Sequence, residues 1–441
     1  MLFLNELLNI SVAMFAGLML TRLGNKLKLP DVTAYLVAGV LIGPCVLGAL
    51  HIPGLGFSSF DELEALGAIS DVALGFIAFS IGNEFRLSQL RETGRQALVI
   101  GILQALVTTL VVDAALLGLH FLFPQALSVP AAITLGAIAA ATAPAATLMV
   151  VRQYKAKGKL TDLLLPIVAL DDAVGLVVFA VSFGVARALS SGIVDVYTIV
   201  VNPILEILGS LFLGALAGLG LAKIEPFFHS NTNRIAMSIS FVFLTVALSM
   251  LKIPAGGATI GFSPLLVCMM LGSVFCNLCP LSEEIMRVAD RWTAPVLVLF
   301  FVLSGAELEL GVFAKAGSVA IGLVYILSRS LGKYIGAGWS SSMVHSPECV
   351  RKYLGITLLP QAGVALGMCS TAYRVLGGTE GTLIRNIVLF SVLVYELIGP
   401  SLTKWALTKA GDIQTMPEDV ASRRKKKLQE VTKPVPPAFQ K

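Results

Sequence analysis

The chain consists of long apolar runs separated by short polar segments. The runs are continuously apolar, and many reach about 18 residues, enough for a helix to cross roughly 30 Å of hydrocarbon. They lack the roughly ten-residue alternation of a transmembrane β-strand, which predicts an all-α integral membrane protein. We expect thirteen transmembrane helices, at about residues 2–21, 32–50, 63–82, 97–119, 129–151, 163–187, 197–222, 235–251, 258–277, 292–306, 313–339, 352–373 and 384–407.

The composition supports a membrane protein. Of the 441 residues, 56% are hydrophobic and 13% are charged, whereas a soluble domain is about 25% charged. The first apolar run has no basic leader, so we expect no cleavable signal sequence. Cys276 and Cys279 lack a second pair or nearby histidines, and we interpret them as small apolar residues rather than zinc ligands. We expect the lipid bilayer as surroundings, no cofactor and no nucleic-acid partner.

The basic residues predict how the chain is oriented. Of the 32 Lys and Arg residues, 25 lie in one alternating set of loops and the tail, 5 lie in the opposite set, and 2 lie inside a span. Cytoplasmic loops carry the excess of positive charge. We therefore expect a multi-pass protein of the cell (plasma or inner) membrane, with its amino terminus outside. The membrane part would cover residues 1–410, followed by a basic cytoplasmic tail over 411–441.

A short motif occurs twice in the chain. Residues 76–87 and 299–310 both contain G-x-E-x-x-L, and their glutamates, Glu84 and Glu307, are 223 residues apart. Both glutamates are expected near span ends, either at the interface or in an ion pair.

Paired helix breaks accompany this motif. Pro144 and Pro360 interrupt two apolar spans at a similar separation. A single linker helix over 197–222 would separate the two copies. The second copy would therefore run through the membrane in the opposite direction. We predict two inverted six-helix repeats, about 1–188 and 235–408. Inverted repeats with broken helices are a transporter architecture whose substrate site lies near the bilayer midplane.

Two adjacent carboxylates, Asp171 and Asp172, are the strongest chemical signal. They lie inside an apolar span, where an ionised group costs several kcal/mol and is a functional candidate by default. Neighbouring positions are about 100° apart around a helix, so one carboxylate can face a charged partner while the other faces a cavity. The pair indicates a site that holds either a proton or a metal cation. A purely structural ion pair is the alternative.

The broken spans supply further oxygen ligands. Pro144 frees a backbone carbonyl near residue 140, and Thr142 adds a hydroxyl group. Pro360 and Gln361 occupy the corresponding break of the second repeat. Unwound carbonyls and half-helix ends bind small cations in broken-helix transporters. A simple proline kink is the alternative at each position.

Two basic residues, Arg329 and Lys333, lie in the eleventh span on one helix face. Arg329 lies deep enough to need a counter-charge, for which the candidates are Asp171 and Glu307, with Glu307 preferred. Lys333 is expected nearer the outer surface, reached by snorkelling. An Asp171 pair would leave Asp172 as the only exchanging group and make transport electroneutral. A Glu307 pair would free Asp171 to titrate as well and make it electrogenic.

These motifs together resemble a known family. LPDVTAYLVAGVLIGP at residues 29–44, the G-x-E after the third span, Thr-Ala-Pro at 142–144 and LDDAVG at 170–175 resemble the monovalent cation:proton antiporter-2 family of the sodium/proton exchanger superfamily. The similarity covers residues 1 to about 408. The short tail leaves no room for the dinucleotide-binding domain that some relatives carry, and we expect none.

The resemblance implies a fold and a mechanism. It implies a homodimer, a dimerisation domain, a six-helix core with two crossed broken helices, and an elevator-like motion. Asp172 would be the essential cation- and proton-binding carboxylate, and Asp171 would pair with a basic residue. Bacterial members usually have lysine at that position, which the spacing assigns here to Arg329. Because arginine cannot release its proton, the basic residue at that position would then not carry a proton.

The sequence thus predicts a secondary active antiporter that exchanges Na⁺, or Li⁺ or K⁺, for H⁺. A sodium-coupled organic anion symporter of similar fold is the nearest alternative, and it would need a roomy polar cavity. An intramembrane aspartyl protease is remote, because it needs two carboxylates facing one water and neighbours on a helix point apart. No P-loop motif is found, so ATP-driven transport is unsupported.

Overall fold

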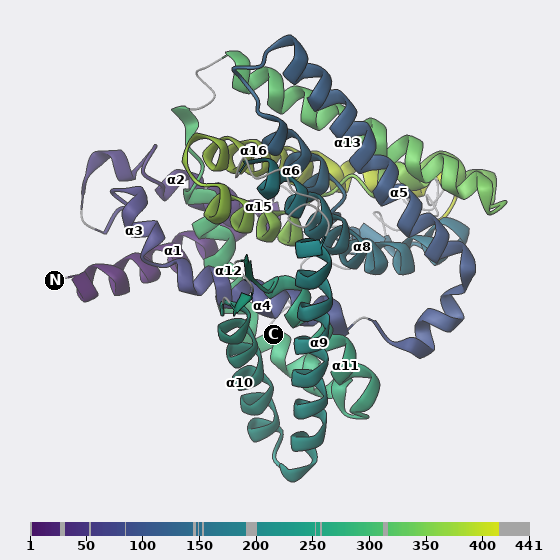
Figure 1. The fold of residues 1–441 in the computed structure, drawn as a ribbon, viewed down its shortest axis with the longest axis horizontal. Coiled ribbons are helices and arrows are strands. Elements are labelled where there is room, and N and C mark those ends of the chain that lie inside the picture. Colours follow the sequence, from purple (N-terminus) through teal and green to yellow (C-terminus); the bar gives the residue numbers. More distant parts are fainter. Residues whose placement is uncertain are drawn as a thin grey trace, which may run out of the picture.

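Over the residues that it describes, the computed structural model shows a helical protein that contains one short β-hairpin (Figure 1). The hairpin pairs β1 (Ile253–Ala255) with β2 (Ala258–Ile260) in antiparallel fashion. The all-α prediction is therefore confirmed, with this small exception. The structure describes residues 2–26, 31–52, 54–83, 85–143, 147–148, 150–151, 154–190, 201–251, 253–255, 258–311 and 316–413.

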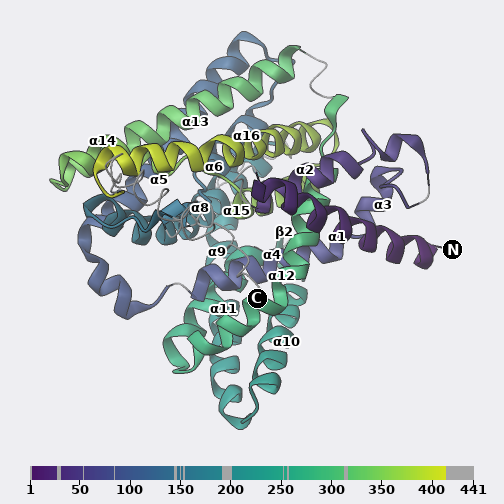
Figure 2. The same ribbon diagram turned by 180° about the vertical axis from the view of Figure 1, so that it is seen from behind.

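Seven of the described helices pack mainly on one another and form what we call the scaffold bundle. In Figure 1, α9 and α10 project together from one end of this bundle, and Figure 2 shows the same arrangement from behind. Three short elements are connected to it: η1 (Gly48–Leu50), α3 (Phe60–Glu64) and η3 (Glu225–Phe227). The seven helices are α1 (Leu2–Lys26), α2 (Asp31–Ile42), α4 (Gly67–Asn83), α9 (Asn202–Ile224), α10 (Asn231–Ser249), α11 (Pro264–Leu278) and α12 (Ser282–Ala306).

A second group of helices forms what we call the broken-helix bundle. Two of its helical runs are interrupted, after α6 and between α14 and α15. In both ribbon views α5 and α13 lie side by side along one edge (Figures 1 and 2). The helices are α5 (Leu87–Leu122), α6 (Val129–Ala139), α8 (Lys159–Ser190), α13 (Ala316–Met343), α14 (Glu348–Thr357), α15 (Gly363–Leu376) and α16 (Gly378–Ala410).

Many of these helices suit a bilayer. Among the described residues, six helices are long and apolar enough to cross a membrane, and the bent helix α12 raises the number to seven. Shorter apolar helices, α2, α4, α6 and α11, lie among them. Each predicted span overlaps at least one helix of the structure.

The predicted span 32–50 is longer than the helix that forms there. Helix α2 ends at Ile42, and the Ile42 carbonyl accepts a hydrogen bond from the Phe57 N–H at 2.8 Å. Pro44 explains this ending, because proline lacks an N–H and disfavours helical geometry in the residue before it. Proline also bounds the break between α14 and α15, where residues 358–362 are not helical.

The repeated motif has a structural role in helix packing. A Cβ atom at Gly82 of α4 would lie 1.9 Å from the Met269 carbonyl oxygen of α11, and one at Gly305 of α12 would lie 2.1 Å from the Leu36 carbonyl oxygen of α2. The reverse contacts are equally close: Gly272 of α11 faces the backbone of α4, and Gly39 of α2 faces that of α12. Glycine is required at these positions because any side chain would hold the backbones apart. The two helix pairs therefore pack in the same way.

A similar close approach joins α5 to α13. A Cβ atom at Gly332 would lie 2.9 Å from the Thr108 Cα, and one at Gly336 would lie 3.0 Å from the Gln104 carbonyl oxygen. The spacing of four residues places both glycines on one face of α13. Lys333 lies between them in sequence and is thereby held against α5.

Candidate functional site

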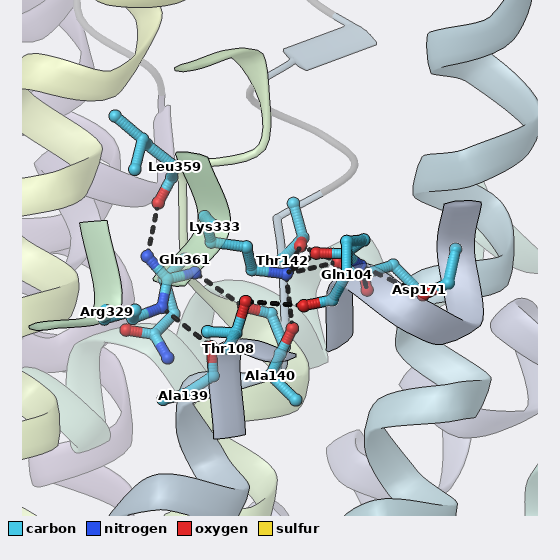
Figure 3. A network of polar contacts seen from close by, with 12 residues as sticks. Gln104, Thr108, Ala139, Ala140, Thr142, Asp171, Arg329, Lys333, Leu359 and Gln361 are labelled. Carbon is cyan, nitrogen blue, oxygen red and sulfur yellow. Dashed lines mark hydrogen bonds and ion pairs between the residues drawn. The ribbon is translucent and has the colours of Figure 1, made fainter. Parts of the chain in front are cut away.

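The two adjacent aspartates lie midway along α8 and are fully enclosed, at 0% exposure for Asp171 and 2% for Asp172. Asp171 points into the interior of the broken-helix bundle (Figure 3). Asp172 lines a cavity between the two bundles. The structure thus separates the two carboxylates as their spacing on the helix predicts.

Asp171 accepts hydrogen bonds from three side chains on three other segments. The Lys333 Nζ lies 2.8 Å from its Oδ2 and forms an ion pair in which both side chains are completely buried. The Thr142 hydroxyl donates to the same oxygen, and the Gln104 Nε2 donates to Oδ1. A buried carboxylate requires this degree of compensation, because an unpaired one would be very costly.

The prediction that Lys333 lies near the outer surface is wrong. Its Nζ also donates to the Ala140 carbonyl at 2.6 Å, to Thr142 Oγ1 at 2.9 Å and to Gln104 Oε1 at 3.1 Å. The close packing of α13 on α5 and the unwound chain after α6 together surround the ammonium group with oxygen atoms. The carbonyl predicted to be free near residue 140 is therefore present, and it accepts from Lys333.

The preferred pairing of Arg329 with Glu307 is also wrong, as is the assignment of Arg329 as the basic partner of Asp171. The Arg329 guanidinium donates to the carbonyls of Ala139 at 3.0 Å, Ala141 at 2.7 Å and Leu359 at 2.7 Å. These carbonyls lie at the C-terminal ends of α6 and α14, where helices carry partial negative charge. The guanidinium also lies 4.5 Å from the centre of the Tyr395 ring.

The two helix breaks contact each other beside these basic residues. The Ala143 N–H donates to the Pro360 carbonyl at 2.9 Å, and the Gln361 Nε2 donates to the Ile138 carbonyl at 3.1 Å. Gln361 also donates to the Tyr325 hydroxyl at 3.2 Å. Pro144, predicted to cause the first break, lies outside the described residues, as does Glu84 of the repeated motif.

Glu307 lies elsewhere. It lines a small pocket with Ser304, Ser70 and Arg385. Arg385 forms an ion pair with Glu309 at 2.7 Å. Glu307 therefore belongs to the contact region between the bundles, away from the Asp171 cluster.

The cavity that reaches Asp172 has a volume of about 460 Å³. Besides Asp172, it is lined by Thr142 and by Gly363 at the start of α15. Its opposite wall comes from the scaffold bundle and includes Asp31 and Thr293. Most of the remaining walls are apolar: Val32, Tyr35, Phe76, Ile77, Ile81, Ala143, Leu148, Ala294, Leu297, Val298, Phe301, Ala362 and Val364.

This arrangement can bind a small cation. Asp172 and Thr142 present a carboxylate and a hydroxyl to one cavity, and oxygen is the ligand that hard cations prefer. The N-terminal end of α15 brings partial positive charge to the same cavity, which favours an ionised carboxylate there. Asp172 can hold either a proton or a cation at this place.

Gln104 was not predicted as a site residue from the sequence. It is completely buried and contacts both Asp171 and Lys333 (Figure 3). A lone amide in the apolar run IGILQALVTTL was the available signal. An amide at this depth needs hydrogen-bond partners, but the sequence does not say which helices supply them.

The chain is similar to known proteins along most of its length. The chain is 23% identical to the high-affinity Na⁺/H⁺ antiporter NhaS3 of Synechocystis, over 89% of the chain and 88% of that protein. It is 24% identical to the Na⁺/H⁺ antiporter 1 of Methanocaldococcus jannaschii, over 74% of the chain and 75% of that protein. The solved structure of the sodium proton antiporter MjNhaP1 from Methanocaldococcus jannaschii matches with a TM-score of 0.71 at 19% identity, over 92% of the chain and all of that structure. The family described as "Sodium/hydrogen exchanger, transmembrane" matches residues 10–409, and the chain belongs to this family of multi-pass membrane transporters.

Proposed function

We propose that the protein is a secondary active antiporter that exchanges a monovalent cation for protons. The observation that carries the proposal is the placement of Asp172 in a cavity between two bundles, next to crossed helix breaks. Family membership and the Na⁺/H⁺ antiporters among the relatives support the same activity. The mostly apolar cavity does not favour an organic anion as the substrate.

Exchange follows from competition at Asp172. When the carboxylate binds a cation with the help of Thr142, it cannot keep its proton, and when it is protonated it no longer attracts the cation. While Lys333 keeps its proton it neutralises Asp171, at 2.8 Å, and only Asp172 then attracts the cation.

Lys333 affects the number of protons that can be exchanged for each cation. Unlike arginine, a buried lysine can release its proton. With Lys333 in place of Arg329 as the partner of Asp171, a second exchangeable proton becomes available. We propose a cycle of two protons per cation, which is electrogenic. In this cycle the second proton comes from Lys333. It would have come from Asp171 if Arg329 were paired with Glu307.

The proposed topology has thirteen spans in two inverted six-helix repeats. Three observations support it: the paired breaks after α6 and α14, the cross-contact between them, and the glycine contacts of α4 with α11 and of α12 with α2. The scaffold and broken-helix bundles are built mainly from internal contacts. This separation supports an elevator-like displacement of one bundle against the other.

Further parts of the proposal concern assembly and orientation. The distribution of basic residues supports an outside amino terminus and a cytoplasmic carboxyl terminus in the cell membrane. By this orientation, Asp31 lies at the cytoplasmic side of the cavity. The resemblance to the family supports a homodimer, for which the scaffold bundle would supply the interface.

Proteoliposomes test the activity. Purified protein is reconstituted with an imposed pH gradient, and Na⁺, Li⁺ and K⁺ are added in turn outside. We expect at least one cation to collapse the gradient, with Na⁺ as the leading candidate. Failure of all three between pH 6 and 9 would reject the antiporter. Sodium-induced current on a solid-supported membrane tests the two-proton cycle, and active protein without current would reject it.

A further inference from the structure

Asp412 joins the ends of two helices on the side that the proposed orientation makes cytoplasmic. It follows the end of α16 and is 6% exposed. Its Oδ2 accepts hydrogen bonds from the Thr161 N–H at 2.7 Å and from the Thr161 hydroxyl at 2.8 Å. Thr161 lies in the first turn of α8, the helix that carries the two adjacent aspartates. Asp412 therefore caps the amino-terminal end of α8 from a distant part of the chain.

The backbone on both sides of this contact is held as well. The Lys157 N–H donates to the Asp412 carbonyl at 2.9 Å, and the Asp412 N–H donates to the Leu407 carbonyl at 3.0 Å. A Cβ atom at Gly158 would lie 2.3 Å from Asp412 Oδ1. A larger residue at that position would therefore have to displace the carboxyl group from Thr161.

The first turn of α8 has few other sources of stability. The first N–H groups of a helix have no partner within it, and a side-chain oxygen that accepts from them stabilises the helix. Pro166 lies inside α8 and lacks the N–H that would bond the Asp162 carbonyl. Because proline is also favoured at the first position of a helix, α8 without its cap can begin near Pro166, close to Asp171.

An apolar cluster surrounds the capped end and extends to one of the helix breaks. Leu160 and Leu164 of α8 are buried in it together with Leu407 and Ile413 at the end of α16. Leu358, the first residue after α14, belongs to the same cluster. Figure 2 shows the end of α16, in yellow, beside α14. The position of α8 is therefore linked to the break that lies beside the candidate cation site.

We propose that Asp412 is a positioning residue for cation binding. By capping α8 it holds this helix in the position in which Asp172 and Thr142 face the same cavity. The inference rests on the antiport proposed above. Asp412 is not among the described residues that line that cavity, so it acts through the helix that it caps. A ligand binds more weakly in proportion to the fraction of molecules that lack the competent arrangement.

Asp412→Ala removes both contacts to Thr161. In the ion-free protein α8 then occupies the competent position in a smaller fraction of molecules, so the KM for the cation should rise about two- to fivefold. At saturating cation the bound ion favours the competent position, so kcat should stay within about twofold of the unchanged protein. A loss of folded protein alone would lower the apparent kcat and leave KM unchanged.

Three further variants separate the cap from other effects. Asp412→Asn keeps an acceptor oxygen, and asparagine caps helices about as well as aspartate, so its KM should stay close to that of the unchanged protein. Gly158→Ala displaces the carboxyl group from the other side of the contact and should raise KM as Asp412→Ala does. Asp162→Ala is the matched control, because Asp162 is an exposed carboxylate in the same first turn. It should leave KM unchanged.

The experiment records the collapse of a pH gradient in proteoliposomes over a series of Na⁺ concentrations for these five proteins. A second measurement does not depend on transport. Thermal unfolding is compared for the unchanged protein, Asp412→Ala, Thr161→Val and the double variant. The double variant should lose less stability than the sum of the two single losses, because both changes act on the same contact.

The inference is wrong if Asp412→Ala and Gly158→Ala keep the KM of the unchanged protein, or if Asp412→Asn raises KM as much as Asp412→Ala does. Additive losses in thermal unfolding would also overturn it. If the unchanged protein exchanges no cation, the proposed antiport fails. The concentration of Na⁺ or Li⁺ that half-maximally stabilises each purified protein then replaces KM, and equal values for all variants overturn the role of Asp412.

Discussion

The interior of the broken-helix bundle and the interface between the two bundles handle charge in opposite ways. In the interior, Asp171, Lys333 and Arg329 are completely buried and are surrounded by hydrogen-bond partners from the helix breaks and from α5. At the interface, charges line cavities or form partly exposed ion pairs. The interior network is costly to disturb, whereas interface contacts of this kind are weak.

The interface itself has two unlike sides. On the side of Asp31, a cavity leads to Asp172. On the other side, three ion pairs join the bundles: Arg187 with Glu206 at 3.1 Å, Arg385 with Glu309 at 2.7 Å, and Arg374 with Asp71. Two of these pairs line a second cavity, of about 460 Å³, whose lining does not include Asp172. The comparison predicts that the interior is rigid and that the interface rearranges at a small cost in free energy.

The largest effect is expected at Asp172. Asp172→Asn removes the carboxylate that proton and cation share, so exchange should fall to background at every pH from 6 to 9. Gradient collapse in proteoliposomes measures this loss. Asp162→Asn is the matched control, because Asp162 is an exposed carboxylate in the first turn of the same helix. Measurable exchange by Asp172→Asn would contradict the assignment of the site.

Lys333→Met should have the next largest effect, which is expected on the stability of the protein. It leaves Asp171 as a buried carboxylate without its ammonium, which costs about 3–5 kcal/mol. Asp171→Asn alone should weaken exchange and change its pH dependence while sparing more activity than Asp172→Asn. The double variant that combines Lys333→Met with Asp171→Asn should lose less stability than the sum of the losses in the two single variants, because the pair acts as a unit. Thermal unfolding in detergent gives all three values, and strict additivity would argue against an interior pair.

Removing an ion pair at the interface should have a smaller effect. Arg374→Gln and Arg187→Gln, which remove partly exposed pairs, should each shift the balance towards opening on that side by about 0.2–1 kcal/mol, or about 1.4- to 5-fold. The apparent KM for a cation added on that side should fall accordingly in oriented proteoliposomes.

Arg234→Gln is the control for this series. Its pair with Glu225, at 2.8 Å, lies within the scaffold bundle and joins no element of the other bundle. If Arg234→Gln lowers KM as much as Arg374→Gln does, the two pairs have no special role in closing the interface.

The smallest effect is expected at Asp31, on the opposite side of the interface. Asp31→Asn removes an exposed negative charge that lines the cavity and should raise KM on that side about twofold at low ionic strength. The effect should disappear above roughly 0.5 M salt, where charges are screened within a few ångströms. Asp61→Asn, an exposed acidic residue of α3, should change nothing. A salt-independent rise would indicate a structural defect instead.

Local sequence rules predicted much of this protein. Continuous apolar runs predicted helices at the right places because a bilayer allows few other structures. Family membership and the named relatives confirm the predicted cation/proton antiport at the level of activity. The adjacent aspartates were identified as the candidate site because charge in an apolar span is expensive. The role of Asp172 as the exchanging group stays a prediction.

The roles of Arg329 and Lys333 could not be decided in the same way. They are one turn apart on the same face, which is about 5.4 Å along the axis. Depth and charge alone made Arg329 the better partner for a carboxylate. The contacts that make Lys333 the partner of the carboxylate come from segments distant in sequence. The carbonyls of Ala139 and Leu359 accept hydrogen bonds from the Arg329 guanidinium, and Asp171 accepts one from the Lys333 ammonium.

What the sequence by itself determined is the set of groups that must find partners: two aspartates, two basic residues and two breaks. The tertiary structure decided how they are paired, because pairing depends on which helices approach closely enough. Gly332 and Gly336 bring α5 against α13, and the crossed breaks bring free carbonyls to the same place. A local pattern records the cost of burying a charge, but only the packing of distant helices supplies the atoms that offset it.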